Sequence, residues 1–359
     1  KRIAVILFNL GGPDKIEEVK PFLFNLFNDK AIINLPQPLR FFLAKFISAK
    51  REKKAQKIYA SIGGKSPLLD HSLDQAHRLE RELSYLGNFK VFVSMRYAQP
   101  FAQEIVEKVL EYNPDEAILL PLYPQFSTTT SESSLNDFAS QLTKKSPKKI
   151  GLKFICCYPN DPDFIRSHAL LIKKTLLKSD NKNVSDFEFL FSAHGLPQKV
   201  INGGDPYVFQ VAETTKKVVE NLAALLNTDP ASIHHQICYQ SKVGPMQWTS
   251  PSLDLSLKKA VLSKKIPVVI PISFVSEHSE TLAELDIEYK KIAQDFGAQE
   301  YLRVPALNVD GHFIKSLTQI CKNVSSQNDS KCFSGQSKTR ICPKEFNKCP
   351  NFNFCSDEG

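Results

Sequence analysis

The stretch that decides the fold is Ile3-Ala4-Val5-Ile6-Leu7-Phe8, followed by the turn sequence Asn9-Leu10-Gly11-Gly12-Pro13. An apolar run without polar alternation is typical of a strand buried on both faces of a parallel sheet. A signal peptide also begins with basic and then apolar residues, but it has a longer apolar region and a small-residue cleavage site. We therefore expect a buried first strand over residues 3–8. Because the chain starts without Met, removal of an upstream segment stays open.

Working outward, short apolar runs alternate with longer amphipathic stretches along the whole chain. This alternation predicts an α/β fold with parallel sheets and helices on both faces. About eight strands favour two smaller doubly wound domains over one barrel, with a polar break at residues 144–149. The expected strands are 3–9, 89–95, 116–122, 150–157, 186–192, 234–240, 266–273 and 299–304, and the expected helices include 14–28, 70–86, 101–113, 161–178, 207–226 and 281–296.

Composition excludes several classes of protein. The 359 residues are 42% hydrophobic and 23% charged, which excludes a disordered chain, a collagen and a coiled coil. The net charge is 46 − 38 = +8, which suits an anionic ligand or a lipid surface and is too diffuse to indicate nucleic acid. No apolar stretch is long enough to span a membrane. No phosphate-binding glycine motif follows a strand, so we expect no nucleotide.

Two segments stand apart from this pattern. Residues 20–57 combine apolar and basic side chains, which suits either a membrane-surface element or a buried helix pair with a solvated basic end. Residues 324–359 are rich in Ser, Asn and Lys and cannot bury a core by themselves. Five of the eight cysteines fall in the last 39 residues, unlike the even spread of a secreted disulfide scaffold. We therefore expect a reduced cytoplasmic protein with a special tail.

Polar motifs follow the carboxyl ends of six expected strands. Open α/β sheets bind ligands outside these ends, so we expect the motifs to converge on one cleft between the two domains. The six motifs are Asn9 to Pro13, Arg96-Tyr97, Tyr123 to Ser127, Ser192 to Gly195, Gln240 to Pro245 and Ser276 to Glu280.

The motif after strand 266–273 carries carboxylates and an imidazole. Glu280, Glu284 and Glu288 stand at i, i+4 and i+8, so they share one face of a helix and repel each other. A divalent cation or plain solvation would compensate that repulsion. Glu280 lies near the strand end beside His278, and this donor set suits a borderline metal such as Fe²⁺.

Two further residues are candidates on position alone. His194 directly follows an apolar strand and precedes Gly195, which suits a proton acceptor or a structural histidine bonded to backbone. Trp248 is the only Trp and lies in a Gly/Pro loop, which suits either a wall for a flat aromatic ligand or a core anchor.

Taken together, these motifs resemble the ferrochelatase family, whose members insert Fe²⁺ into a porphyrin at the final step of haem synthesis. The resemblance covers about residues 1–320. The matching stretches, in family order, are Asn9 to Pro13, Gly64 to Leu68, Met95 to Tyr97, Tyr123 to Ser127, Phe191 to Pro197, Tyr239 to Pro245 and Phe274 to Tyr289.

The resemblance implies an organisation and a set of site residues. It implies two Rossmann-like halves, residues 1–149 and 150–323, with a porphyrin cleft between them and a Cys-rich extension over 324–359. It makes residues 20–57 the lip over the pocket, which touches the membrane in this family. His194 and Glu280 are implied as catalytic and metal-contacting residues, Glu277, His278, Glu284 and Glu288 as carriers of metal or protons, and Leu10, Arg96, Tyr97, Ser127, Trp248 and Phe274 as porphyrin-binding residues.

Metal entry must remove two pyrrole protons, so we expect His194 on one side of the porphyrin and Glu280 on the other, with Glu284 and Glu288 as a relay. Arg96 is expected to pair with the porphyrin propionates. Two alternatives are a non-catalytic porphyrin or haem carrier and a cobalt or coproporphyrin chelatase. We expect the chain to be a monomer or a homodimer. We expect it to be cytoplasmic or peripheral on the inner face of the membrane, and we expect no nucleic-acid partner.

The tail departs from the family pattern. Cluster-containing members place one cysteine ligand after the Tyr-Pro-Gln sequence, where this chain has Ser127-Thr128-Thr129-Thr130. The tail itself supplies four thiols, which suit a [2Fe–2S] cluster or Zn, or stay unliganded. We expect [2Fe–2S], because the short spacing of common zinc sites is missing. The four residues are Cys332, Cys342, Cys349 and Cys355.

Overall fold

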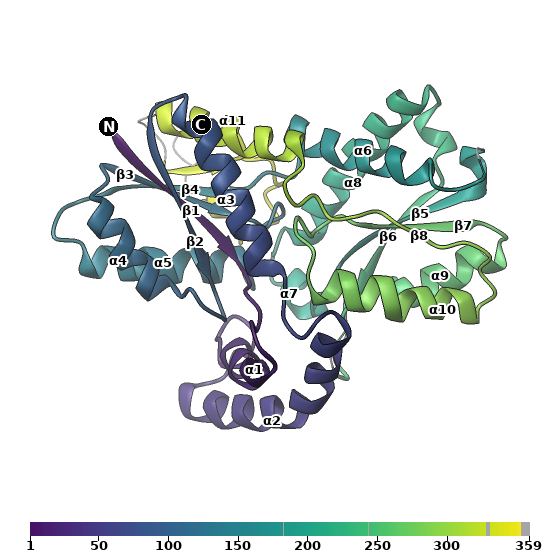
Figure 1. The fold of residues 1–359 in the computed structure, drawn as a ribbon, viewed down its shortest axis with the longest axis horizontal. Coiled ribbons are helices and arrows are strands. Elements are labelled where there is room, and N and C mark those ends of the chain that lie inside the picture. The colour runs from purple at the N-terminus through teal and green to yellow at the C-terminus, as the bar shows by residue number, and fades with distance from the viewer. Residues whose placement is uncertain (182, 243, 328–330, 353–359) are drawn as a thin grey trace. The chain divides into compact units, whose positions relative to one another are not determined.

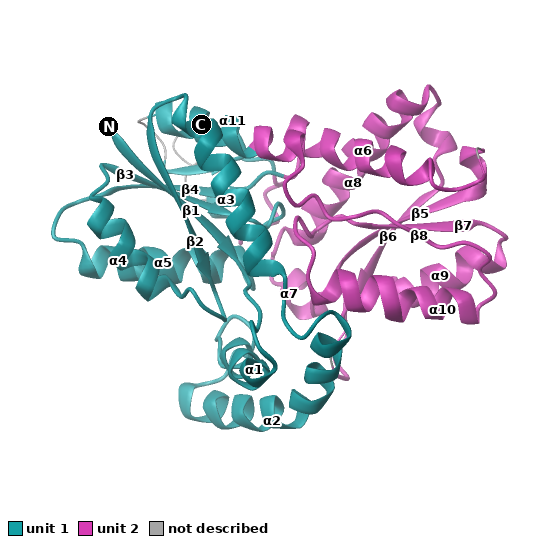
Figure 2. Cartoon of the chain, viewed as in Figure 1, with its two compact units in different colours: residues 1–158, 317–341, 350–359 teal, residues 159–316, 342–349 magenta. Residues whose placement is uncertain are grey.

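The structure is a computed structural model that describes residues 1–181, 183–242, 244–327 and 331–352. The chain forms two compact units, which Figure 2 colours separately. Unit 1 contains residues 1–158 and 317–341 and the last segment from residue 350, and unit 2 contains residues 159–316 and 342–349. Among the helices of the described residues, none has the length and hydrophobicity needed to cross a membrane.

Unit 1 contains a five-stranded parallel sheet in the order β2-β1-β3-β4-β9 (Figure 1). The decisive apolar run forms β1, which pairs with β2 and β3 and is buried from Ile3 to Asn9. A strand paired on both edges and covered on both faces needs continuous apolar side chains, which explains its sequence. The strands are β1 (Arg2–Asn9), β2 (Asn88–Met95), β3 (Glu116–Pro121), β4 (Gly151–Cys157) and β9 (Cys332–Ser334).

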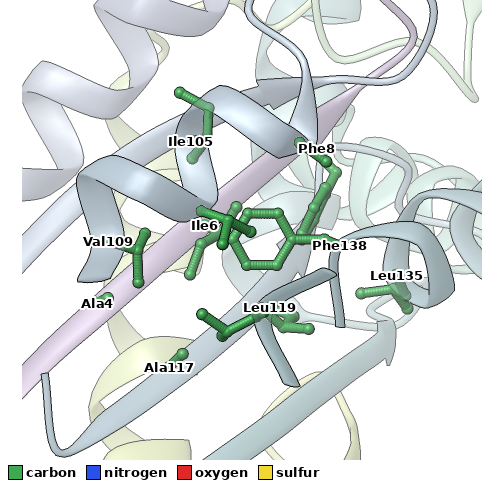
Figure 3. Close-up of a cluster of buried hydrophobic side chains, with 12 residues drawn as sticks. Ala4, Ile6, Phe8, Ile105, Val109, Ala117, Leu119, Leu135 and Phe138 are labelled. Carbon is green, nitrogen blue, oxygen red and sulfur yellow. The ribbon is translucent and has the colours of Figure 1, made fainter. Parts of the chain in front are cut away.

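The core of unit 1 lies between β1, β3 and the helices that pack on them. Figure 3 shows Ile6 and Phe8 of β1 together with Leu119 of β3 and Phe138 of a covering helix. The rings of Phe8 and Phe138 meet edge to face at 5.4 Å between centroids, a favoured aromatic geometry. The helices are η1 (Ile16–Glu18), α1 (Val19–Phe27), α2 (Gln37–Ser61), α3 (Leu68–Ser84), α4 (Ala102–Tyr112), α5 (Ser131–Lys145) and η5 (Pro350–Phe352). The helix α11 (Gly311–Ser326) begins in unit 2 and belongs to unit 1 from residue 317.

Unit 2 contains a four-stranded parallel sheet in the order β6-β5-β7-β8. In Figure 1, α6 and α8 cover one face of this sheet, and α9 and α10 cover the other. The strands are β5 (Phe187–His194), β6 (His235–Gln240), β7 (Ile266–Pro271) and β8 (Leu302–Arg303). The helices are α6 (Pro162–Leu176), η2 (Val184–Asp186), α7 (Gln198–Asn202), α8 (Tyr207–Leu226), η3 (Pro230–Ser232), α9 (Leu253–Leu262), η4 (Glu280–Tyr289) and α10 (Lys290–Asp295).

Two parallel, helix-covered sheets confirm the expected fold class. The division of the chain differs from the expected boundary at residue 149, because β4 pairs with β3 and so belongs to unit 1. The tail also differs from a separate segment. Its residues 332–334 add β9 to the sheet of unit 1, while residues 342–349 belong to unit 2.

The expected helix over 281–296 is present but begins as a π-helix, η4, over Glu280–Tyr289. A π-helix has a wider turn than an α-helix, is rare, and occurs mostly at functional sites. The apolar spacing of residues 281–296 predicts a helix but does not distinguish these two windings.

Candidate active site

The centre of the candidate site in unit 2 is His194, the last residue of β5. The residue after it must be small, because a Cβ at Gly195 would lie 2.9 Å from the carbonyl oxygen of Gln240 and 3.5 Å from the Trp248 ring. The Gly195 amide donates a 2.9 Å hydrogen bond to that same carbonyl. The close contact of β5 with the end of β6 therefore fixes where His194 leaves the sheet.

His194 forms a hydrogen-bonded pair with Glu280, the first residue of η4. Nδ1 of His194 lies 2.7 Å from Oε2 of Glu280, and the two side chains are 37% and 20% exposed. Burial alone would lower the pKa of His194, but the Glu280 carboxylate outweighs it and raises that pKa. Burial would raise the pKa of Glu280, but His194 and the hydroxyl of Ser241 outweigh it and lower that pKa. The pair therefore stabilises the imidazolium that forms when His194 accepts a proton, beside an ionised carboxylate.

A second carboxylate, Glu284, lies next to this pair. Ser241 Oγ is 2.6 Å from Glu284 Oε2 and 3.3 Å from Glu280 Oε2. Nε2 of Gln240 donates to Glu284 Oε2 at 3.0 Å and to the Glu280 carbonyl at 2.8 Å. Burial and the negative charge of Glu280 raise the pKa of Glu284 to about 7. Glu284 can therefore take up or release a proton near neutral pH.

The position of the two catalytic candidates corrects one expectation. We expected His194 and Glu280 on opposite sides of a porphyrin, but their side chains are in direct hydrogen-bond contact at 2.7 Å. A macrocycle between them would need about 3.5 Å of van der Waals separation on each side. The structure therefore leaves no room for a macrocycle between the two side chains.

The carboxylates on η4 run from buried to exposed along the helix. Glu280 and Glu284 are half-buried, and Glu288 is exposed. The expected shared face is thus present, and it leads from His194 towards solvent. Hydrogen bonds from Ser241 and Gln240 reduce the repulsion at the buried end, and water reduces it at Glu288.

Glu277 and His278 lie before η4, and both side chains are engaged. Oε1 of Glu277 accepts a 2.5 Å hydrogen bond from Arg303 Nη1 and a 2.9 Å bond from the Ala306 amide. Burial would raise the pKa of Glu277, but Arg303 outweighs it and the pKa is lowered. Nδ1 of His278 is 3.1 Å from the Ser276 carbonyl, and burial is the main cause of a lowered pKa. His278 is therefore held neutral more readily than His194.

Two aromatic residues expected to bind porphyrin lie in the same unit. Trp248 is half-buried against Gly195, next to His194 along the chain, and bridges to Pro197. The Phe274 ring packs on the His278 ring at 4.8 Å between centroids. The Trp248 ring therefore lies beside the segment that carries His194, and the Phe274 ring contacts His278 directly.

Arg96 and Tyr97 in unit 1 belong to a separate network after β2. Arg96 Nη2 lies 2.8 Å from Asp29 Oδ2, Nη1 lies 3.4 Å from Asp137, and Nε donates to Ser133 Oγ at 2.8 Å. The Tyr97 hydroxyl donates to Asp29 at 2.8 Å. Arg96 is 24% exposed, whereas Tyr97 is only 2% exposed. Of these two residues, Arg96 is the one that a ligand could reach.

The other two expected pocket residues of unit 1 differ from each other. Leu10 is half-buried, and its carbonyl accepts a 2.9 Å hydrogen bond from the Tyr97 amide. Ser127 is 1% exposed, and its Oγ lies 2.9 Å from Thr129 Oγ1. The Ser127 hydroxyl is therefore used inside the unit.

The described tail cysteines are buried in two different environments. Cys332 packs with Cys156, Cys157 and Phe126 in unit 1, while Cys342 in unit 2 accepts a 3.1 Å hydrogen bond from Gln210. Cys349 is 2% exposed. Cys355 lies outside the described residues. Among the residues that the structure describes, no three His, Cys, Asp or Glu side chains are arranged to hold a metal ion.

Several residues of these networks were not predicted. Gln240 and Ser241 stand in a strand-end motif, so their position was the available signal. Asp29, Asp286 and Arg303 carry no comparable signal, because their partners are distant in sequence. Ser241 has a φ of 63°, a left-handed conformation that is strained for a residue other than glycine.

Known proteins of one family resemble this chain over nearly its whole length. The family model for ferrochelatase matches residues 2–325. A ferrochelatase of Rickettsia felis is 50% identical over 351 residues, covering 97% of this chain and 98% of the relative. One of Pelagibacter ubique is 46% identical over 356 residues, covering 98% and 99%. A structure of SirB from Bacillus subtilis with Fe³⁺ shares the fold at a TM-score of 0.50, with 11% identity and coverage of 91% and 96%. The chain belongs to the ferrochelatase family.

Proposed function

We propose that this chain inserts Fe²⁺ into protoporphyrin, releases two protons, and uses His194 and Glu280 to take up the first of them. The observation that carries the proposal is the 2.7 Å contact between His194 Nδ1 and Glu280 Oε2. It supports a base whose protonated form is stabilised by a fixed carboxylate, which is what removal of a pyrrole proton requires.

The pairing determines which ring nitrogen acts. Because the Glu280 carboxylate accepts the hydrogen bond, Nδ1 of neutral His194 carries the proton and Nε2 keeps its lone pair. Nε2 is therefore the atom proposed to accept a pyrrole proton. The imidazolium that forms is stabilised by Glu280, in agreement with the raised pKa of His194.

The proton then needs a way out, because a second one must follow. We assign this step to Glu284 and Glu288, with the Ser241 hydroxyl between Glu280 and Glu284. Glu284 has a pKa of about 7, so it can accept and release a proton at working pH. Glu288 is exposed and can pass the proton to water. The same oxygens and His194 are the proposed transient contacts of the substrate Fe²⁺, with His278 beside them.

Porphyrin binding is assigned to residues of both units, each by its own chemistry. Arg96 supplies a partly exposed guanidinium for a propionate, although it must share that charge with Asp29 and Asp137. Trp248, Phe274 and Leu10 supply half-buried apolar surface. Tyr97 and Ser127 are buried and engaged, so their proposed role is to hold the segments around Arg96 and residues 121–127 in place.

The direct test is anaerobic turnover with Fe²⁺, followed by the loss of free-base porphyrin fluorescence. Consumption of many equivalents of porphyrin per chain supports the proposal. Binding of one equivalent without turnover would instead identify a carrier. Coproporphyrin and Co²⁺ in parallel reactions distinguish the related chelatases, since a faster reaction with either would reassign the substrate.

We also propose that the protein sits on the cytoplasmic membrane surface through residues 20–57. In α2 the side chains of Leu39, Phe42 and Phe46 are 61%, 68% and 64% exposed. Lys45, Lys50, Lys53, Lys54 and Lys57 are exposed on the same helix. Exposed apolar side chains beside basic ones suit anionic lipid headgroups.

Co-sedimentation with vesicles of anionic phospholipid tests the membrane proposal. Phe42→Glu should weaken binding several-fold, because it removes apolar area and adds a like charge to the lipid. Leu177→Glu is the matched control, since Leu177 is also 68% exposed but lies in unit 2. Equal binding of the two variants would contradict the proposal.

A [2Fe–2S] cluster on Cys332, Cys342, Cys349 and Cys355 is proposed from donor chemistry alone. The three of these that are described do not form a ligand set in this structure, so no step of the reaction is assigned to a cluster. Iron and labile sulfide in anaerobically purified protein, lost in Cys342→Ser and kept in Cys321→Ala, would support it. Stoichiometric Zn, or no metal, would contradict it.

A further inference from the structure

The winding of η4 is held from outside by Arg303, the last residue of β8. Nη1 of Arg303 contacts Glu277 Oε1 at 2.5 Å, before η4 begins. Nε contacts Asp286 Oδ1 at 2.7 Å, and Nη2 contacts Asp286 Oδ2, in the second half of η4. One guanidinium thus joins two residues that bracket Glu280 and Glu284 in the sequence.

The neighbouring Tyr301 reinforces the same contact. Tyr301 lies directly before β8. The Tyr301 hydroxyl donates a 2.8 Å hydrogen bond to the carbonyl of Leu285, the residue before Asp286. Two consecutive positions of the π-helix are therefore tied to the edge of the sheet.

The segment before η4, residues 275–277, forms further hydrogen bonds with residues 306–308, next to Arg303 along the chain. The Glu277 amide donates to Asn308 Oδ1 at 3.0 Å, and the Asn308 amide donates to the Val275 carbonyl at 2.8 Å. With the Ala306 amide and Arg303 on Glu277, residues 303–308 hold the segment before η4 through four contacts. The carboxylate segment can shift its register only if these contacts break.

From this geometry we infer that Arg303 is a positioning residue for metal insertion. It acts through Glu277 and Asp286, by fixing where η4 places Glu280 and Glu284 relative to His194. The inference rests on the proposed roles of Glu280 and Glu284. An arginine is suited to this task because its rigid fork satisfies both oxygens of Asp286 and still reaches Glu277. A lysine supplies the same charge but cannot make both contacts with that geometry.

Arg303→Lys tests the inference while keeping the buried positive charge. A displacement of about 1 Å in a reacting group can cost about 100-fold in rate, so we expect kcat to fall roughly 10- to 100-fold. The KM for porphyrin should stay within about twofold, because Arg303 contacts none of the proposed porphyrin residues. Rates are corrected for the folded fraction, measured by circular dichroism.

A double-mutant cycle with Glu284→Gln separates positioning from simple loss of stability. If Arg303 acts by placing Glu284, then adding Arg303→Lys to Glu284→Gln should lower kcat by much less than it does in the wild type. Equal losses in both backgrounds, or a kcat of Arg303→Lys within twofold of wild type, would overturn the inference. Ser167→Ala is the control, because it removes a buried 2.7 Å bond to Asp310 in the same unit and should leave kcat unchanged.

Failure of the proposed proton relay and misfolding of Arg303→Lys can both be distinguished from failure of the inference about Arg303. If Glu284→Gln alone is as active as wild type, the proposed relay fails, and the cycle is run with Glu280→Gln. If Arg303→Lys does not fold, Asp286→Asn and Tyr301→Phe weaken the same attachment at its other contacts and must show the same kcat loss. Normal kcat in both of these variants overturns the inference.

Discussion

The Arg96 network of unit 1 and the His194 network of unit 2 use the same kinds of group with opposite results. In unit 1 a guanidinium lies between two carboxylates, and Asp29 also accepts hydrogen bonds from Ser133 and Tyr97. The pKa of Asp29 is lowered, because these hydrogen bonds and Arg96 outweigh its burial. The Asp29 carboxylate is therefore stabilised in its ionised form.

In unit 2 two carboxylates face one histidine. The second carboxylate, Glu284, accepts hydrogen bonds from the neutral side chains of Gln240 and Ser241. The pKa of Glu284 therefore rises to about 7 instead of falling. Each network has two carboxylates and one cationic group, but Arg96 contacts both of its carboxylates, whereas His194 contacts Glu280, and the charge of Glu280 helps to raise the pKa of Glu284. Glu284 can therefore store a proton near neutral pH. We take this difference to separate proton handling in unit 2 from ligand anchoring in unit 1.

The largest effect should come from breaking the His194–Glu280 pair. His194→Ala and Glu280→Gln should each lower turnover by about 10²- to 10⁴-fold, the usual contribution of a positioned acid or base. His312→Ala is a matched control, because that histidine is also 37% exposed and also faces a carboxylate, Asp163, in unit 2. Comparable losses in His312→Ala and His194→Ala would contradict a special role for the pair.

The next effect concerns Glu284, the carboxylate whose pKa is raised. Glu284 must be ionised to accept a proton, so the rate should rise as pH increases through about 7. In Glu284→Gln the rise of the rate through pH 7 should disappear, and kcat should fall roughly 10-fold. Steady-state rates from pH 5.5 to 9 measure both. An unchanged rise in Glu284→Gln would assign it to another group.

A smaller effect is expected in the Arg96 network of unit 1. Arg96→Lys keeps the charge but loses the fork, so the KM for porphyrin should rise several-fold while kcat stays within about twofold. The reverse pattern, a lower kcat at constant KM, would place Arg96 in the chemical step and remove the distinction between the two networks.

The smallest effect is on stability. Asp29 has a lowered pKa in the folded state, so its contribution is present above the unfolded value of 3.8 and is lost as pH falls through the folded value. Asp29→Asn should therefore lower the melting temperature by a few degrees near neutral pH and by less in acid. Thermal melts at pH 7 and pH 2.5 check this, because only the second lies well below the unfolded value of 3.8; an equal loss at both would contradict it.

The sequence predicts the fold better than the site. Runs such as residues 3–8 and 186–192 predict buried strands because an apolar run has few other stable positions. The strand-end positions of His194 and Glu280 likewise predict their meeting, since parallel strands end on the same edge. Spacing along the chain, however, says nothing about side-chain direction, so their placement on opposite sides was wrong.

What could not be predicted depends on contacts between distant segments. Arg303 and Asp286 form an ion pair across 17 residues, and Arg96 reaches Asp137 across 41. The apolar pattern of residues 281–296 likewise carries no sign that η4 is a π-helix or that Arg303 and Tyr301 contact it. Cys332 lies beside Cys156 because β9 pairs with β4. β9 has only three residues, which is too short a run to predict a strand from the sequence.

The most direct test of the account is the protonation state of Glu284. Infrared difference spectra between pH 5 and pH 9 should show a protonated carboxyl band that disappears near pH 7 and is missing in Glu284→Gln. The spectra of Glu288→Gln serve as the control for the same substitution elsewhere on η4. No titrating band in this range, or one unaffected by Glu284→Gln, would contradict the claim that this network stores a proton.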